Sequence, residues 1–206
     1  SLGYGVFARC SSLEKVSLPS LLSDIKSDLF VDCSSLKAIN IPKRVKVIEE
    51  RAFLNCKSLK TVNLGRCLTK IECQAFMKCK SLVEIDLPST LQQIDYDVFN
   101  FCLSLKKIDI SSVQTIDECA FYGCKSLVEI VTSRSLNKIC ESAFENCASL
   151  TNIVIPPSVS QIQDLAFTRC LSLKEIIIPD SIEIITNSTF YGCKSLENVY
   201  LSAKFS

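Results

Sequence analysis

Hydrophobic residues recur along the chain at two alternating spacings. Stretches such as residues 36–42 and 82–88 place apolar side chains at the first, fourth and sixth positions, with mostly polar residues between them. This alternation is typical of a short β-strand whose successive side chains point to opposite faces. A few residues later a second apolar pair follows, such as Val45 and Ile48. The pattern therefore predicts two short extended segments in each unit, joined by a turn.

Each strand pattern begins at the last residue of the motif Phe-x-x-Cys-x-Ser-Leu. The motif occurs nine times at a step of 23 residues, with one step of 22, starting at Phe7, Phe30, Phe53, Phe76, Phe99, Phe121, Phe144, Phe167 and Phe190. A fixed period in this range is the signature of a stacked repeat protein. We predict a single array over residues 1–206, with about nine repeats, that starts and ends in mid-repeat.

Two features predict how each unit turns. Proline follows the strand pattern in five repeats, where its missing N–H ends the ladder, and Gly65 or Ser111 takes its place elsewhere. Acidic or small polar residues precede the Ala-Phe pair, as in Glu49-Glu50, which suits the free N–H groups of a single helical turn. The repeat of 22 residues lacks one residue between Ile110 and Val113. We expect a shorter turn there and an unbroken core.

One such unit cannot bury its own apolar face, so stacked units would bury Leu on Leu, Ile on Ile and Phe on Phe. The predicted fold class is an α/β repeat solenoid. It has a parallel β-sheet along one side, and short extended segments and single helical turns on the other. Strands about 4.8 Å apart would make this sheet roughly 40 Å long.

The pattern L-x-x-I-x-(I/L)-P-x-x-(V/L)-x-x-I-x-x-x-A-F-x-x-C-x-S-L stands as LTNIVIPPSVSQIQDLAFTRCLSL at 150–173. It resembles the BspA-like, or Treponema pallidum-type, leucine-rich repeats and covers essentially the whole chain. The resemblance implies a leucine-rich repeat horseshoe with the parallel sheet on its concave face. It also implies a non-enzymatic binding protein, as in surface adhesion proteins of mucosal bacteria and in large sets from parasitic single-celled eukaryotes.

Charge and hydropathy narrow the choice of partner. Lys and Arg total 23 against 22 Asp and Glu, so the net charge of +1 gives no support for a nucleic acid partner. The apolar runs are far shorter than the roughly 20 residues that span a bilayer, so we expect no membrane insertion.

The chain is rich in cysteine, with thirteen residues, of which nine stand at one phase of the repeat. We interpret these nine as free thiols packed in a row as small hydrophobes. Unpaired cysteines favour the cytoplasm, and the family resemblance implies the cell surface as the alternative.

Candidate chemistry is sparse. The absence of His removes Ser-His-Asp and Cys-His catalysis and the commonest metal ligand. The spacing of Cys67, Cys73 and Cys79 does not match a zinc site, and no glycine-rich phosphate loop occurs. We therefore expect no catalytic residues, no metal, no cofactor and no enzyme activity. A row of lysines after the ladder cysteines, interpreted as solvating charge, comprises Lys57, Lys80, Lys125 and Lys194.

One outward column of the predicted strands changes character along the chain. Its members are Ser17, Asn40, Asn63, Asp86, Asp109, Val131, Val154, Ile177 and Tyr200. The first five are polar and the last four are apolar, which places an apolar strip about 15 Å long in the C-terminal half. The candidate partner-binding residues are Asp86, Asp109, Val131, Val154, Ile177 and Tyr200, with Val128 and Lys174 beside them.

These residues predict a protein–protein interaction module that binds a protein partner through its concave face, in adhesion or recognition. An intracellular scaffold or regulatory protein that uses the same surface is the alternative. Val and Ile also favour strands for local reasons, and a missing C-terminal cap or a second copy of the chain is another cover for the strip. Because neither end carries a polar cap, a fragment, a processed chain or an end-to-end homodimer is a further hypothesis.

Overall fold

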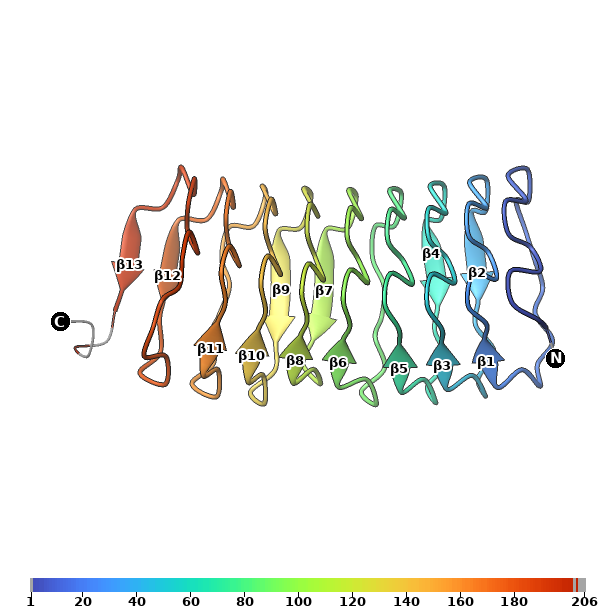
Figure 1. Ribbon diagram of the computed structural model, residues 1–206, viewed down its shortest axis with the longest axis horizontal. Helices are drawn as coiled ribbons and strands as arrows, with labels where there is room; N and C mark the ends of the chain where they lie inside the picture. The colour runs from blue at the N-terminus through green and yellow to red at the C-terminus, as the bar shows by residue number, and fades with distance from the viewer. Residues whose placement is uncertain (1, 202, 204–206) are drawn as a thin grey trace.

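Successive repeats form coils of similar shape that stack on one another. The computed structural model describes residues 2–201 and 203. Figure 1 shows the coils side by side in a nearly straight line, with the first and the last described coils at opposite ends. The coils contain short strands at two positions, one directly after the motif leucine and one in the second extended segment. Strands at the same position in neighbouring coils pair in parallel.

The first kind of strand follows the motif leucine, and we call its exposed side the strand face. These strands are β2 (Ala38–Asn40), β4 (Thr61–Asn63), β7 (Lys107–Ile110), β9 (Glu129–Thr132), β12 (Glu175–Ile177) and β13 (Asn198–Tyr200). They pair as β2–β4, β7–β9 and β12–β13. Residues 82–88 and 150–156 hold the equivalent positions in the intervening coils but form no strand, so the sheet is interrupted there. The single long sheet expected from the sequence is therefore three short pieces. At one break, the Thr132 hydroxyl donates to the Val154 carbonyl oxygen at 2.8 Å. In a regular coil the equivalent oxygen accepts a backbone N–H, as the Asn63 oxygen does from Ile41.

The second kind of strand confirms the second extended segment. These strands are β1 (Asp24–Ile25), β3 (Val47–Ile48), β5 (Lys70–Ile71), β6 (Gln93–Ile94), β8 (Thr115–Ile116), β10 (Lys138–Ile139) and β11 (Gln161–Ile162). They form two parallel sheets, in the orders β1-β3-β5 and β6-β8-β10-β11. The register aligns the isoleucines, as in Ile48 with Ile71, so equivalent side chains enter the core together.

The predicted single helical turns are wrong, since the described residues contain no helix. The reason is that successive backbone N–H groups donate in turn to an oxygen of their own coil and to an oxygen of the next coil. The Leu54 N–H donates within its turn to the Arg51 oxygen at 3.0 Å, whereas the Phe53 N–H donates to Ala75 of the next coil at 2.8 Å. A helix would keep both bonds within the segment. Arg51 and Asn55, with φ of 55° and 62°, turn the backbone so that the coils can bond to each other.

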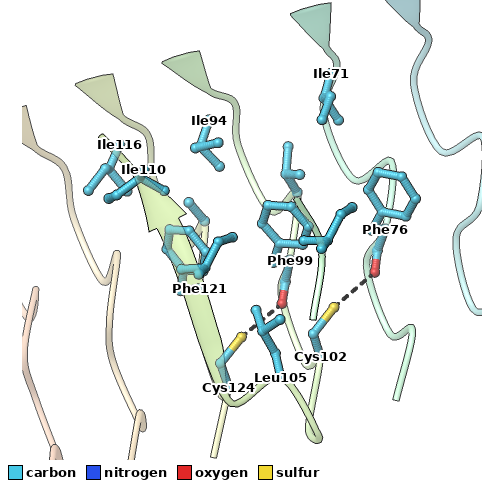
Figure 2. Packing of buried hydrophobic residues seen from close by; sticks show 14 of the residues in the cluster. Ile71, Phe76, Ile94, Phe99, Cys102, Leu105, Ile110, Ile116, Phe121 and Cys124 are labelled. Carbon is cyan, nitrogen blue, oxygen red and sulfur yellow. Dashed lines mark hydrogen bonds between the residues drawn. The ribbon is translucent and has the colours of Figure 1, made fainter. Parts of the chain in front are cut away.

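The motif phenylalanines form a continuous stack through the core. Ring centroids of successive residues lie 5.2 to 5.9 Å apart, with interplanar angles of 1° to 12°. Figure 2 shows Phe76, Phe99 and Phe121 in this stack. Offset rings at such separations attract each other beyond the area that they bury. The predicted burial of Phe on Phe is confirmed.

The ladder cysteines lie beside this stack, packed in a row as predicted. All thirteen cysteines of the chain are free thiols. Eight ladder thiols also donate to the carbonyl oxygen of the motif Phe in the preceding coil, at 3.0 to 3.3 Å. Figure 2 shows two of these bonds, from Cys102 and Cys124. The thiols therefore tie neighbouring coils together as well as filling space.

The 22-residue repeat keeps its core through a shorter turn, as expected. In a regular coil the Val45 N–H donates to the Pro42 oxygen, at 3.0 Å. In the short repeat the Val113 N–H donates to the oxygen of Ile110, the last strand residue, also at 3.0 Å. Ile110 and Val113 are both fully buried, so the deletion is absorbed outside the core.

Candidate interaction surface

The strand face places the predicted column on the outside of the molecule. In β9 the Ile130 side chain is buried and the Val131 side chain is 37% exposed, as alternation along a strand requires. The register pairs Asp109 with Val131 and Ile177 with Tyr200, so members of the column in paired strands lie next to one another. All eight candidate partner-binding residues are exposed. Whether they bind a partner stays a prediction.

We call Val131, Val154, Ile177 and Tyr200 the apolar strip. The exposed fractions of the last three are 66%, 64% and 53%, and Val128 beside them is 46% exposed. Large apolar side chains left this open in successive coils form a patch, whereas single exposed ones are common on any protein.

A shallow groove crosses the apolar strip where strand pairing is interrupted. It has a volume of about 390 Å³ and is lined by residues 130–134 together with Val154 and Pro156. Arg134 supplies the one charge in this lining. Among the described residues it forms no ion pair. Arg134 did not emerge from the sequence, because the turn that brings it to the strip becomes evident only in the folded coil.

Some of the polar residues that border the strip have a partner within the chain, whereas Lys174 has no ion pair with a described residue. Lys107 and Glu129 pair at 2.8 Å across β7 and β9, so their charges satisfy each other. The Asp109 carboxylate accepts the Ser111 N–H at 2.8 Å, which holds it at the polar end of the column. Lys174 is exposed and has no ion pair within the described part of the chain.

A second surface lies outside the candidate set that the outward column predicts. Residues 33–48 and 54–71, which include β2 and β4, contain eight Lys and Arg residues and no Asp or Glu. We call these two segments the basic coils. The signal was available in the sequence as two stretches free of acids, but the balanced total charge concealed it.

Other kinds of site find no support in residues 2–201 and 203. There, no group of three or more His, Cys, Asp or Glu side chains is arranged to hold a metal ion. No helix in this part of the chain is long and apolar enough to cross a membrane.

Known proteins share this architecture. The family model described as "BspA type Leucine rich repeat region (6 copies)" matches residues 1–128 and 114–206, which together span the sequence. The chain belongs to the BspA-type leucine-rich repeat family. The resemblance drawn from the consensus is confirmed, and so is a parallel leucine-rich repeat solenoid. BspA-type repeat proteins are generally non-enzymatic, and leucine-rich repeat proteins typically bind protein partners.

Three solved structures are similar to this BspA-type chain. A leucine-rich repeat protein from Bacteroides ovatus is 30% identical, with a TM-score of 0.81 over 99% of this chain and 59% of that one. A leucine rich cell surface protein from Faecalibacterium prausnitzii is 27% identical, with a TM-score of 0.62 over 96% and 62%. A leucine-rich repeat protein of T. pallidum is 26% identical, with a TM-score of 0.65 over 84% and 70%.

The chain spans less than two thirds of the length of the first two of these proteins. No curated protein sequence matches it.

Proposed function

We propose that this chain is a protein-binding module that captures a partner through the C-terminal half of its strand face, without catalysis of its own. The observation that carries the proposal is the apolar strip. The outward column is polar in the first five coils, but in the last four it presents large apolar side chains to the solvent. An exposed apolar patch with a polar rim commonly marks a protein interaction site.

The rest of the candidate set suits such a site. Tyr200 offers a large, partly polar ring of the kind that anchors interfaces. Asp86, Asp109 and Lys174 would form the rim, where charges set orientation and association rate more than affinity. Val128 would extend the apolar contact on the side of Lys174.

The role that we propose is adhesion or recognition. Support comes from the Faecalibacterium prausnitzii relative, whose name describes a cell surface protein and whose similarity covers 96% of this chain. The alternative is an intracellular scaffold or regulatory protein that uses the same surface. Thirteen free thiols favour that alternative, because free thiols persist in reducing compartments. The partner's own location distinguishes the two roles.

The test is crosslinking capture from native cells, with mass spectrometry to identify the partner. Val131→Ser, Val154→Ser and Ile177→Ser, combined in one variant, should abolish capture and leave the fold intact, because these side chains lie outside the core. The matched control changes three exposed apolar residues outside the strip to Ser, namely Val83, Leu171 and Ile184. The control should capture the partner as the unchanged chain does. Equal capture by a folded strip variant would remove the proposal.

A second copy of the chain is another occupant of the strip. Sedimentation over a range of concentrations tests it directly. A dimer that the strip variant dissociates would assign the strip to self-association, whereas a monomer at every concentration leaves it available to a different protein.

A further inference from the structure

Exposed cations such as Lys37 and Lys43 stand at the two ends of the strand face of the basic coils, and others, such as Lys70 in β5, lie outside this face. Neither segment contains an acid. The eight cations are Lys37, Lys43, Arg44, Lys46, Lys57, Lys60, Arg66 and Lys70, and all are exposed. The net charge of the whole chain is only +1, so the balancing acids lie elsewhere. A local excess of one sign creates a field that attracts ligands of the other sign.

Most of these cations have no counter-charge. Lys37 pairs with Glu14 at 2.7 Å and Lys70 with Glu72 at 3.1 Å, whereas the other six form no ion pair with any described residue. Elsewhere the stacking of coils sets opposite charges together, as in Lys26 with Glu49 at 2.6 Å.

The turns of the basic coils instead set like charges side by side. Gly65 makes this possible, because a Cβ there would lie 2.8 Å from the Pro42 oxygen and 3.0 Å from the Lys43 Cα. Only a residue without a side chain lets the two turns approach so closely, and that approach brings Arg66 beside Lys43. Neighbouring like charges destabilise a structure in the absence of a counter-ion. Such local conflicts are expected at binding sites.

The floor between the two charged ends is uncharged and mostly polar. Ala38 and Thr61 lie in register on β2 and β4, as do Asn40 and Asn63. The Asn63 amide nitrogen donates to the Asn40 side-chain oxygen at 2.5 Å. This bond uses one N–H of Asn63, so both side-chain N–H groups of Asn40 and the side-chain oxygen of Asn63 stay free to bind a ligand.

A shallow groove joins this floor to the cations at one end. It has a volume of about 580 Å³ and is lined by Asn40, Ile41, Lys43, Asn63, Leu64, Gly65, Arg66 and Cys67. Along the strand, Lys37 and Lys43 are six residues apart, so the cations at the two ends are about 20 Å apart. A linear ligand of several units would span that distance.

We propose that the basic coils bind a sulfated oligosaccharide. Sulfate groups accept strong, charge-assisted hydrogen bonds from Lys and Arg. Sugar hydroxyls both donate and accept, which matches the free N–H and oxygen of the two asparagines. Single-stranded nucleic acid fits less well, because it stacks on aromatic side chains and the basic coils expose none.

The test is isothermal titration of the full chain with a heparin-derived hexasaccharide. Lys43→Glu with Arg66→Glu should weaken binding by at least about tenfold, because two charge-assisted contacts are lost. Lys125→Glu with Lys194→Glu is the matched control, with the same charge change outside the basic coils, and should stay within about twofold of the unchanged chain. Circular dichroism checks the fold, and Lys43→Gln with Arg66→Gln repeats the test without charge reversal.

Further ligands separate a sulfated sugar from other anions. Asn63→Ala should weaken hexasaccharide binding without altering its salt dependence, because an amide contact is lost and no charge changes. The desulfated hexasaccharide, poly-glutamate and a single-stranded oligonucleotide should each bind at least about tenfold more weakly than the sulfated sugar. The strip variant described above should bind the hexasaccharide normally, so this proposal and the proposed protein interaction can fail separately.

Three results would overturn the inference. The first is no binding of the hexasaccharide by the unchanged chain. The second is an equal loss in the control pair. The third is equal affinity for poly-glutamate or for the oligonucleotide.

Discussion

In the coils of β2 and β4 the outward column holds Asn40 and Asn63, whereas in the coils of β9 and β12 the same column holds Val131 and Ile177. Beneath both pairs the inward residues are buried isoleucine or valine, on one continuous phenylalanine stack. Successive side chains of a strand point to opposite faces, so the outward residues can change without disturbing the core. We therefore expect function in this molecule to depend on the positions that vary between coils.

The largest expected effect tests whether the two halves share one core. Phe121 stacks between Phe99 and Phe144, with centroids 5.5 and 5.4 Å away. Phe121→Ala should lower the free energy of unfolding by about 3–5 kcal/mol, because it leaves a cavity in the stack. Urea unfolding followed by circular dichroism measures the loss, and hydrogen exchange reports on each half.

Both halves should then exchange faster in the Phe121→Ala variant. Faster exchange confined to the coils around residue 121 would show that the halves unfold independently. Val131→Ala, on the exposed face of a neighbouring coil, is the control and should change stability by no more than about 0.5 kcal/mol.

A pH titration should destabilise both halves alike. Burial raises the pKa of Cys33 from 9.0 to about 11 and that of Cys124 from 9.0 to about 12. Above pH 9 the thiols of the unfolded chain lose their protons while those of the folded chain keep them. The folded state then binds more protons, so the free energy of unfolding falls as pH rises from 9 towards 12.

Urea midpoints measured between pH 8 and pH 11 check this prediction. Cys124→Ser, which cannot ionise in this range, should show a shallower decline than the unchanged chain. An identical slope in the two proteins would contradict the role given to the ladder thiols.

A smaller effect concerns the turns opposite the strand face, where the halves also differ. Glu49 accepts the Ser27 N–H at 3.0 Å and pairs with Lys26, whereas its counterpart Gln163 accepts the Glu141 N–H at 3.2 Å without charge. Glu49→Gln would make the N-terminal turn resemble the C-terminal one. It should cost no more than about 1 kcal/mol, and molar salt should abolish the difference. Thermal unfolding at low and high salt measures both, and a loss that salt leaves unchanged would refute an electrostatic cause.

The smallest effect at any single site should come from making the C-terminal column polar. Val131→Asn, Val154→Asn and Ile177→Asn together should change the free energy of unfolding by only about 0.5 kcal/mol per site, because surface substitutions rarely cost more. Binding of a hydrophobic dye should fall, since the apolar strip is lost. Chemical denaturation and dye fluorescence check the two parts. A large loss of stability would show that the strip belongs to the core.

Much of the fold could be predicted because each repeat confirms the others. Nine copies of one motif fix which side chains point inward, and they located the missing residue between Ile110 and Val113. The helical turns failed because acidic residues before an Ala-Phe pair suit a helix start and a coil-to-coil bond equally well. In the folded chain the Glu49 carboxylate reaches Ser27 of the neighbouring coil instead of its own turn.

The candidate site could be predicted in part. The alternation of apolar and polar residues in the sequence was enough to predict that Val131, Val154 and Ile177 are exposed. It could not predict that Arg134 lines the same groove. The basic coils were readable as two stretches without acids, yet only the register of β2 on β4 brings Asn40 against Asn63. Contacts between coils depend on residues about one repeat apart in the sequence, which a local pattern does not specify.

By itself the sequence determined the period, the inward ladders of Phe, Cys, Leu and Ile, and the change of the outward column after Asp109. Side-chain direction follows from local periodicity, so no tertiary information was needed for these features. The tertiary structure alone decided that the ladder thiols bond to the preceding coil, that Gly65 sets Arg66 beside Lys43, and that strand pairing breaks at residues 150–156. These features depend on the distance between neighbouring backbones, which is set only when the coils stack.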